Sequence, residues 1–445
     1  MSATIRIPII FISPETSPNS YTGALGGPPL IREWLEKEMH KLIYVLRNNF
    51  SDTDLVFYVV KNVDDAVKVL DSEKDSIGFV VVLLHTWSGG ATRVFLESGK
   101  PVVLIAESYG GGGEFLLEYS RAVEENRPVI GISIRDLDDK IVIKKVRLLK
   151  VLARLKMTRI LFVTLNIDWF RKISSLIHDL FGIEPVVIDG REFVEKYYMK
   201  TDDAEAEKYM REWIKNADRV YETSHIDILK AAKLYIAMRK ALEDHKADSI
   251  AVDCINLYDS KVLDAWPCLG YMQLWLDGYV PVCEADPYSA VMLLIIWLLN
   301  NEPGFISDPV LDYKNNEIIY YHCYAPINPL GGNIRVSYSI TSAHLGLKKA
   351  SVYVDLPVNQ IITAAQIIPD QKTIIIHKAK TLRNEFSGHA CATKLVATSN
   401  VRVLARNWRW TWHRVVFYGD FAEDIKDLAR LIGFKVIEED KSRED

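Results

Sequence analysis

Carboxylate side chains follow two apolar runs in the middle of the chain. Glu284 comes directly after residues 280–283, and Asp308 follows residues 304–307 and precedes a proline. A carboxylate at the end of a buried strand is costly unless it is paired or binds a cation. Two such groups on either side of one helix can converge on a single ion, and oxygen ligands suit Mn²⁺, Co²⁺ or Mg²⁺. The sequence therefore predicts a divalent-metal site around Glu284 and Asp308.

Asp286 lies in the same acidic cluster, directly before Pro287, where a helix is expected to begin. Asp is a preferred N-cap residue, so the interpretation as a helix cap comes first for Asp286. A turn residue before proline is the corresponding interpretation for Asp308, and it stays open. Glu284 is harder to explain in this way, because glutamate is a poor cap and the residues before it should be buried.

Short apolar runs alternate with amphipathic segments through the first 310 residues. The expected strands are residues 5–12, 55–60, 77–84, 102–106, 160–163, 185–188, 249–253 and 280–283. The expected helices are residues 29–49, 63–70, 114–125, 168–181, 202–245, 267–277 and 287–299. This alternation predicts an α/β fold with two Rossmann-like domains, each a parallel sheet covered by helices.

The pattern changes after Asp308, where short β-type runs are separated by Asn, Gly and Pro turn signals. These runs are residues 318–324, 334–338, 350–356, 361–368, 372–379, 392–398 and 414–418. They predict an antiparallel, barrel-like C-terminal region, closed by a helix at 421–432 and a strand at 434–437. The expected domains are therefore residues 1–150, 151–310 and 311–445.

Four consecutive glycines at residues 110–113 follow an expected strand and precede an expected helix. Such a loop can cradle a phosphate at the N-terminus of a helix. It lacks both the G-x-G-x-x-G spacing and the lysine of a P-loop, so a flexible turn or lid is the favoured interpretation.

Composition excludes several classes of partner. The 445 residues are 49% hydrophobic and 25% charged, with a net charge of −5, which argues against a nucleic-acid surface. Without an 18-residue apolar run or a signal-peptide layout, we expect no membrane partner and a cytoplasmic location. The five cysteines are widely spaced without a C-x-x-C pair, which favours buried thiols over disulfides or structural zinc.

Six short motifs follow one another through the central and C-terminal regions. They are Ala251-Val-Asp253-Cys254, Pro267-Cys268-Leu269, Cys283-Glu284-Ala285-Asp286, Pro303-Gly-Phe-Ile-Ser-Asp308-Pro309, Tyr321-His-Cys-Tyr-Ala-Pro326 and His413-Arg-Val-Val-Phe-Tyr-Gly-Asp420. As an ordered set, from about residue 150 to 445, they resemble the L-fucose/L-arabinose isomerase family. The resemblance implies an enzyme that interconverts a non-phosphorylated aldose and its ketose through an enediol. It also implies a homo-oligomer, often a hexamer.

The resemblance assigns roles to three residues. Glu284 and Asp308 match metal-binding carboxylates that also act as acid and base, and their positions, 284 and 308, fit the family spacing. His413 matches the metal-binding histidine, in line with the common use of neutral imidazole as a ligand. The implied cofactor is a divalent metal, Mn²⁺ before Co²⁺ or Mg²⁺, which stabilises charge on the sugar oxygens as a Lewis acid. Which carboxylate takes the carbon proton stays open.

Four further residues are candidates for contact with the sugar. By the resemblance, Trp87 reaches into the active site of a neighbouring subunit. His322 stands at a strand end, where a substrate hydrogen bond and a structural core position are equally compatible. Arg335 lies beside a glycine-containing loop, and His389 is also a rival third metal ligand.

Three tryptophans alternate with other residues just before His413, at positions 408, 410 and 412. On a strand they would share one face, opposite His413. We therefore expect at least two of them to lie in the core and not beside the metal.

Two other functions are compatible with these residues. A sugar-binding or regulatory protein can retain the fold without the chemistry, although a costly acidic pair has little use in a binder. A metal-dependent hydrolase or lyase acting on a polyol also fits, because a metal with two carboxylates can activate water. The identity of the sugar is not encoded in any motif above.

Overall fold

The computed structural model describes residues 5–13, 32–85, 88–342 and 349–442. It forms two compact units, one of residues 1–154 with 423–435 and one of residues 155–422 with 436–445. The second unit therefore contains both the central region and the β-rich region. The proposed boundary near residue 310 stays a prediction. Within the described residues, no helix is both long and apolar enough to cross a bilayer.

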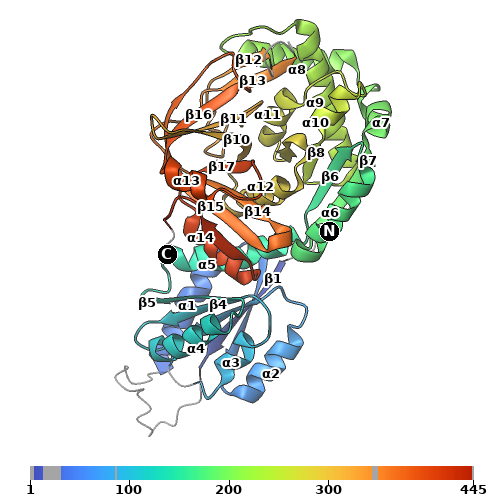
Figure 1. The fold of residues 1–445 in the computed structure, drawn as a ribbon. Helices are drawn as coiled ribbons and strands as arrows, with labels where there is room; N and C mark the ends of the chain where they lie inside the picture. The colour runs from blue at the N-terminus through green and yellow to red at the C-terminus, as the bar shows by residue number, and fades with distance from the viewer. Residues whose placement is uncertain (1–4, 14–31, 86–87, 343–348, 443–445) are drawn as a thin grey trace. The chain divides into compact units, whose positions relative to one another are not determined.

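The first unit is built on a parallel sheet with the strand order β2-β1-β3-β4-β5 (Figure 1). Its strands are β1 (Ile5–Ile12), β2 (Thr53–Val60), β3 (Phe79–Leu83), β4 (Val102–Glu107) and β5 (Val129–Ile134). Its helices are α1 (Arg32–Asn49), α2 (Val63–Ser72), α3 (Ala91–Leu96), α4 (Gly112–Glu124), α5 (Lys140–Leu155) and α14 (Ala422–Leu431). This is one of the two common doubly wound orders.

The central strands β3 and β4 are buried at every position, which explains their unbroken runs of Val, Ile and Leu. The glycine run next to them forms a turn, one of the two expected alternatives, and this turn packs closely against β3. A Cβ on Gly111 would lie 2.3 Å from the carbonyl oxygen of Leu83, so only glycine allows this approach at the start of α4.

The second unit begins with a parallel sheet in the order β7-β6-β8-β9. Its strands are β6 (Arg159–Thr164), β7 (Glu184–Asp189), β8 (Ser249–Val252) and β9 (Val280–Val282). The helices are α6 (Ile167–Phe181), α7 (Gly190–Phe193), α8 (Asp203–Asn216), α9 (His225–His245), α10 (Cys254–Asp259), α11 (Cys268–Leu276) and α12 (Pro287–Asn300). The single helix expected over 202–245 is thus two helices, because Val220 pairs with Ile340 between them.

The C-terminal part of the second unit is an antiparallel barrel (Figure 1). Its strands are β10 (Phe305–Asp312), β11 (Glu317–His322), β14 (Ile361–Ile368), β15 (Thr373–Asn384), β16 (Thr393–Thr398) and β17 (Arg414–Tyr418). The ring closes where β14 pairs with β15, and β18 (Lys435–Glu438) extends the sheet beyond β15. A separate hairpin joins β12 (Tyr338–Ser342) and β13 (Ala350–Val354), so the strand expected at 334–338 begins only at its last residue.

The predicted fold class is confirmed, with parallel-sheet α/β regions followed by an antiparallel barrel-like region. Helix α12 connects the two sheets of the second unit, because it contacts β9 of the parallel sheet and β14 and β17 of the barrel. Ten of its 14 residues are buried, which accounts for its unusually apolar sequence. The carboxyl end of β9 and the first barrel strand β10 flank this helix in the chain.

Candidate metal centre

Glu284 is presented by a strained turn at the carboxyl end of the parallel sheet. Strand β9 ends at Val282, and residues 283–285 form a single helical turn before α12 begins. Glu284 and Ala285 have φ values of 56° and 50°, in the left-handed region that costs a non-glycine residue about 1–2 kcal/mol. Such strain is concentrated at functional sites, where the surrounding structure holds it in place.

The other acidic residue, Asp308, lies inside β10 and not at a strand end as predicted. It pairs with Tyr321 of β11, and its neighbour Ser307 pairs with Arg414 of β17. This register brings Asp308 next to His413, the residue immediately before β17. The barrel therefore supplies one carboxylate and one imidazole to the same place.

His322, the last residue of β11, completes the group. Its side chain is fully buried, and its Nε2 lies 3.6 Å from Oε1 of Glu284. The rings of His322 and His413 face each other edge to face at a centroid distance of 6.1 Å. We expected either a substrate contact or a core position for His322, and it lies beside the proposed metal ligands.

Four residues thus meet in one largely buried cluster. Nε2 of His413 lies 3.2 Å from Oδ1 of Asp308 and 3.5 Å from Oε2 of Glu284. One ligand atom from each of Glu284, Asp308, His322 and His413 lies within 4.8 Å of the other three. Two carboxylates and two imidazoles form a donor set that suits divalent transition metals. The cluster can therefore hold a metal ion, but its geometry does not indicate which one.

The electrostatics of the cluster also fit a cation. Burial and the neighbouring charges of Asp308 and Asp286 raise the pKa of Glu284 to about 7, against the opposing effect of His413. Burial alone would lower the pKa of His413, but its hydrogen bonds with Asp286 and Asp308 raise it to about 10. A buried carboxylate with a raised pKa, such as Glu284, is a group that a divalent cation would neutralise.

Asp286 has two functions in the structure. One carboxylate oxygen caps α12 by accepting from the backbone N–H groups of Tyr288 and Ser289, as the cap interpretation predicted. The other lies 2.9 Å from Nδ1 of His413. A carboxylate on the second nitrogen fixes the orientation and tautomer of a ligand histidine. The sequence reasoning missed this contact, although a capping carboxylate always has a second oxygen to offer.

The alternating tryptophans do not form a strand, and the expected core positions are wrong. Helix α13 (Val401–Asn407) precedes an irregular segment in which Trp410 has a φ of 59°. Trp410 and Trp412 are 49% and 53% exposed. Nε1 of Trp412 donates to the carbonyl of Pro309 at 2.8 Å, and its ring meets the edge of Tyr321. An exposed aromatic ring therefore lies next to the strand position of Asp308.

Among the described residues, neither Arg335 nor His389 is a member of the four-residue cluster. Trp87 falls outside the described residues. Arg335 is exposed and lines a cleft with Trp213 and Tyr338. His389 is exposed within the segment that lines another pocket. Their contacts with a sugar stay predictions.

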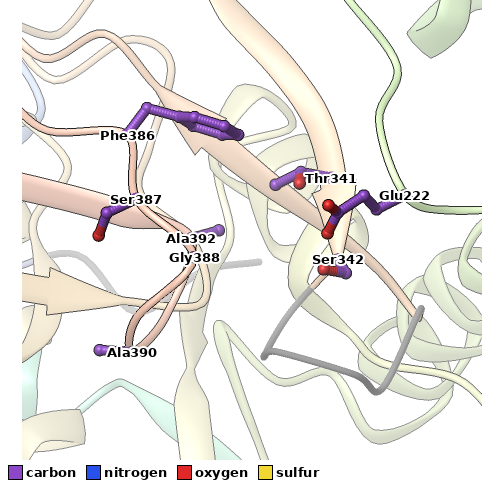
Figure 2. Close-up of a pocket in the computed structure, with 8 residues that line it drawn as sticks. All are labelled: Glu222, Thr341, Ser342, Phe386, Ser387, Gly388, Ala390 and Ala392. Atoms are coloured by element: carbon purple, nitrogen blue, oxygen red, sulfur yellow. The ribbon is translucent and has the colours of Figure 1, made fainter.

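The pocket near His389 has a cavity volume of about 100 Å³. Figure 2 shows Glu222, Thr341 and Ser342 on one side of it and Phe386, Ser387, Gly388, Ala390 and Ala392 on the other. Its lining is rich in hydroxyl groups and small residues. No member of the metal cluster is among the described residues that line it.

Comparison with known proteins gives one relevant likeness. No family model matches the chain. A segment of 154 residues is 28% identical to the sulfoquinovose isomerase of Clostridium sp. (strain MSTE9). The likeness is to a sugar isomerase. The match covers 34% of this chain and 33% of the relative, so the chain spans about a third of the length of the curated relative that it matches.

Proposed function

We propose that the protein is a divalent-metal-dependent isomerase that interconverts an aldose and its ketose. The observation that carries the proposal is the convergence of Glu284, Asp308, His322 and His413 in one cluster. These residues come from separate parts of the second unit. The likeness to a sugar isomerase supports the same reaction class.

An aldose becomes a ketose when a proton moves from C2 to C1 and a second proton moves from the C2 hydroxyl to the C1 oxygen. A bound divalent cation supplies Lewis-acid stabilisation for the negative charge that develops on these oxygens. Glu284 and Asp308 approach the site from different elements, so one carboxylate can serve the carbon proton and the other the oxygen proton. Positioned acid–base groups of this kind contribute about 10²–10⁴ in rate.

The imidazoles and Asp286 would hold the site in shape during these transfers. His413 is fixed at Nδ1 by Asp286, which leaves Nε2 directed at the carboxylates. His322 is fully buried at the end of β11, and its Nε2 lies 3.6 Å from Oε1 of Glu284. Restricted positions for all ligand atoms favour a reactive orientation of the sugar.

The proposed substrate is a non-phosphorylated aldose, and sulfoquinovose is the first to test because the curated relative acts on it by name. The enzyme should be dialysed against a chelator, supplied with Mn²⁺, Co²⁺ or Mg²⁺, and screened with aldoses and ketoses for the isomeric product. We expect activity to disappear with the metal and to return with Mn²⁺ or Co²⁺. Full activity of the metal-free protein would refute the mechanism.

The variant Glu284→Gln tests the acid–base role directly. It removes a proton-accepting oxygen with little change in shape, so we expect at least a hundredfold loss of turnover with an unchanged thermal unfolding profile. Turnover at the wild-type rate would exclude Glu284 from proton transfer. Sugar binding without turnover in the metal-loaded wild-type protein would favour the sugar-binding alternative, and release of water or cleavage products would favour a lyase or hydrolase.

We also propose that the protein is a homo-oligomer, with the hexamer that the family resemblance implies as the first state to test. Sedimentation of the full chain tests this proposal. A monomer that is fully active would rule out a site completed by Trp87 of a neighbouring subunit.

A further inference from the structure

We propose that a buried ion pair between Arg414 and Glu439 positions the histidine and the barrel carboxylate of the metal centre. Both residues are positioning residues, because neither belongs to the cluster of Glu284, Asp308, His322 and His413. The inference rests on the proposed metal-dependent function and adds to it the means by which the site is held.

Arg414 and Glu439 form a bidentate ion pair in the interior of the second unit. Nε and Nη2 of Arg414 donate to the two carboxylate oxygens of Glu439 at 3.0 and 2.6 Å. Both side chains are fully buried. A planar guanidinium matches a carboxylate in only one mutual orientation, so this pair fixes an angle as well as a distance.

The remaining nitrogen of Arg414 holds the segment that carries His413. Nη1 donates to the carbonyl oxygens of Thr411 and His413 at 3.0 and 2.8 Å. The guanidinium also stacks on Trp408, 4.0 Å from the centre of its ring. Residues 408–413 have no regular secondary structure, so these contacts replace the hydrogen-bond ladder that would otherwise fix the segment.

The same residue is connected to the strand of Asp308. Ser307 donates from its hydroxyl to the carbonyl oxygen of Arg414 at 2.9 Å, and the two residues pair between β10 and β17. The histidine and the carboxylate therefore each lie one residue away from this link. A shift of Arg414 would move both ligands relative to Glu284.

Glu439 is anchored in turn to the barrel. Its carboxylate lies 3.0 Å from Nδ1 of His377, and Nε2 of that histidine lies 2.7 Å from the hydroxyl of Tyr320. Asn407 donates to the backbone carbonyl of Glu439 at 3.0 Å. Burial tends to raise the pKa of Glu439, but the hydrogen bond with His377 and the charge of Arg414 outweigh it, and the pKa lies below its ordinary value.

A buried ion pair is a poor means of gaining stability alone. Removing two charges from water is expensive, and well-packed apolar residues of similar volume often stabilise a fold as well or better. Apolar contacts, however, do not fix the orientation of the groups that they join. All four hydrogen bonds of Arg414 are directional, and two of them end on the segment of the metal-binding histidine. This network therefore contributes mainly to the orientation of the segment that carries His413.

The test compares Arg414→Lys with Arg383→Lys in the full chain. Lysine retains the charge but cannot bond Glu439 and the two carbonyls together. Arg383 forms the matched control, a two-pronged pair with Glu317 at 2.7 and 2.8 Å in the same barrel, although it is more exposed. Mn²⁺ affinity is measured by electron paramagnetic resonance of the unbound ion, and folding is measured by thermal unfolding of the metal-free proteins.

We expect Arg414→Lys to bind Mn²⁺ about 10–100-fold more weakly than wild type, as for other groups that orient metal ligands, and Arg383→Lys to stay within about twofold. The spectrum of bound Mn²⁺ should also change in Arg414→Lys. Glu439→Gln retains the shape of the pair and should weaken binding in the same direction, which covers the case that Arg414→Lys does not fold. A folded variant with wild-type Mn²⁺ affinity and spectrum would overturn the inference alone. Failure of the wild-type protein to bind Mn²⁺ would overturn the proposed metal centre with it.

Discussion

Replacing Asp286 by asparagine should separate metal binding from folding. Asp286 caps α12 through one oxygen and orients His413 through the other. Asparagine is as good an N-cap as aspartate, so Asp286→Asn should change the capping contribution to the free energy of unfolding by less than about 0.5 kcal/mol. Asp286→Ala removes the cap as well and should cost about 1 kcal/mol more.

The main expected effect of Asp286→Asn is a loss of metal affinity. An amide replaces a charged acceptor 2.9 Å from Nδ1 of His413, and the histidine is no longer fixed with Nε2 towards Glu284 and Asp308. Groups that orient ligand histidines contribute about 10–100-fold to metal affinity, which corresponds to about 1.4–2.7 kcal/mol. The metal-affinity effect of Asp286→Asn, about 1.4–2.7 kcal/mol, should therefore exceed its effect on the helix cap, which is below about 0.5 kcal/mol.

Calorimetric titration with Mn²⁺ and thermal unfolding in the presence of chelator measure the two quantities. Asp202→Asn is the matched control, because Asp202 caps α8 through two backbone N–H groups and is not part of the cluster. It should leave Mn²⁺ affinity unchanged. The reasoning fails if Asp286→Asn binds Mn²⁺ as tightly as wild type while remaining folded, since the contact with His413 would then have no effect on the ligand.

Three further outcomes follow from the structure. Because the pKa of Glu439 is lowered in the folded protein, its stabilising contribution is complete above about pH 4.5 and is lost as the pH falls through the lower folded-state value. The metal-free wild-type protein should therefore lose stability below pH 4.5 more steeply than Glu439→Gln in acid-unfolding measurements, and equal slopes would contradict this. Gly111→Ala places a Cβ 2.3 Å from a strand carbonyl and should lower the free energy of unfolding by about 1–3 kcal/mol in denaturant titration. Trp412→Ala should raise the KM for the sugar by up to about tenfold with unchanged Mn²⁺ affinity, because its exposed ring flanks the position of Asp308; an unchanged KM would remove this residue from the sugar site.

Local patterns were sufficient to predict most of the fold. Strand β1 occupies the residues expected from its apolar run, because a buried parallel strand needs apolar side chains on both faces. The break between α8 and α9 was not predictable in the same way. It depends on the pairing of Val220 with Ile340, a contact across 120 residues that no local propensity reports.

The site shows the same division between local and distant causes. Glu284 was identifiable because a charged residue after a buried strand needs a partner. The place of Asp308 inside β10 was not, since a proline directly after it favoured a turn. The alternation of Trp408, Trp410 and Trp412 suggested a strand, but a left-handed residue in its middle sends the side chains in different directions. Contacts such as that of His413 with Asp286, 127 residues apart, need the folded chain.

The destabilising features of the candidate metal centre bear on its function. Two consecutive left-handed residues and a partly buried glutamate with a raised pKa oppose stability where the parallel sheet meets α12. A fold under selection for stability alone would replace them with apolar residues that pack as well. A divalent cation bound at this place would neutralise the carboxylates and fix the turn. The strain and the raised pKa around Glu284 therefore support the proposed metal-dependent reaction.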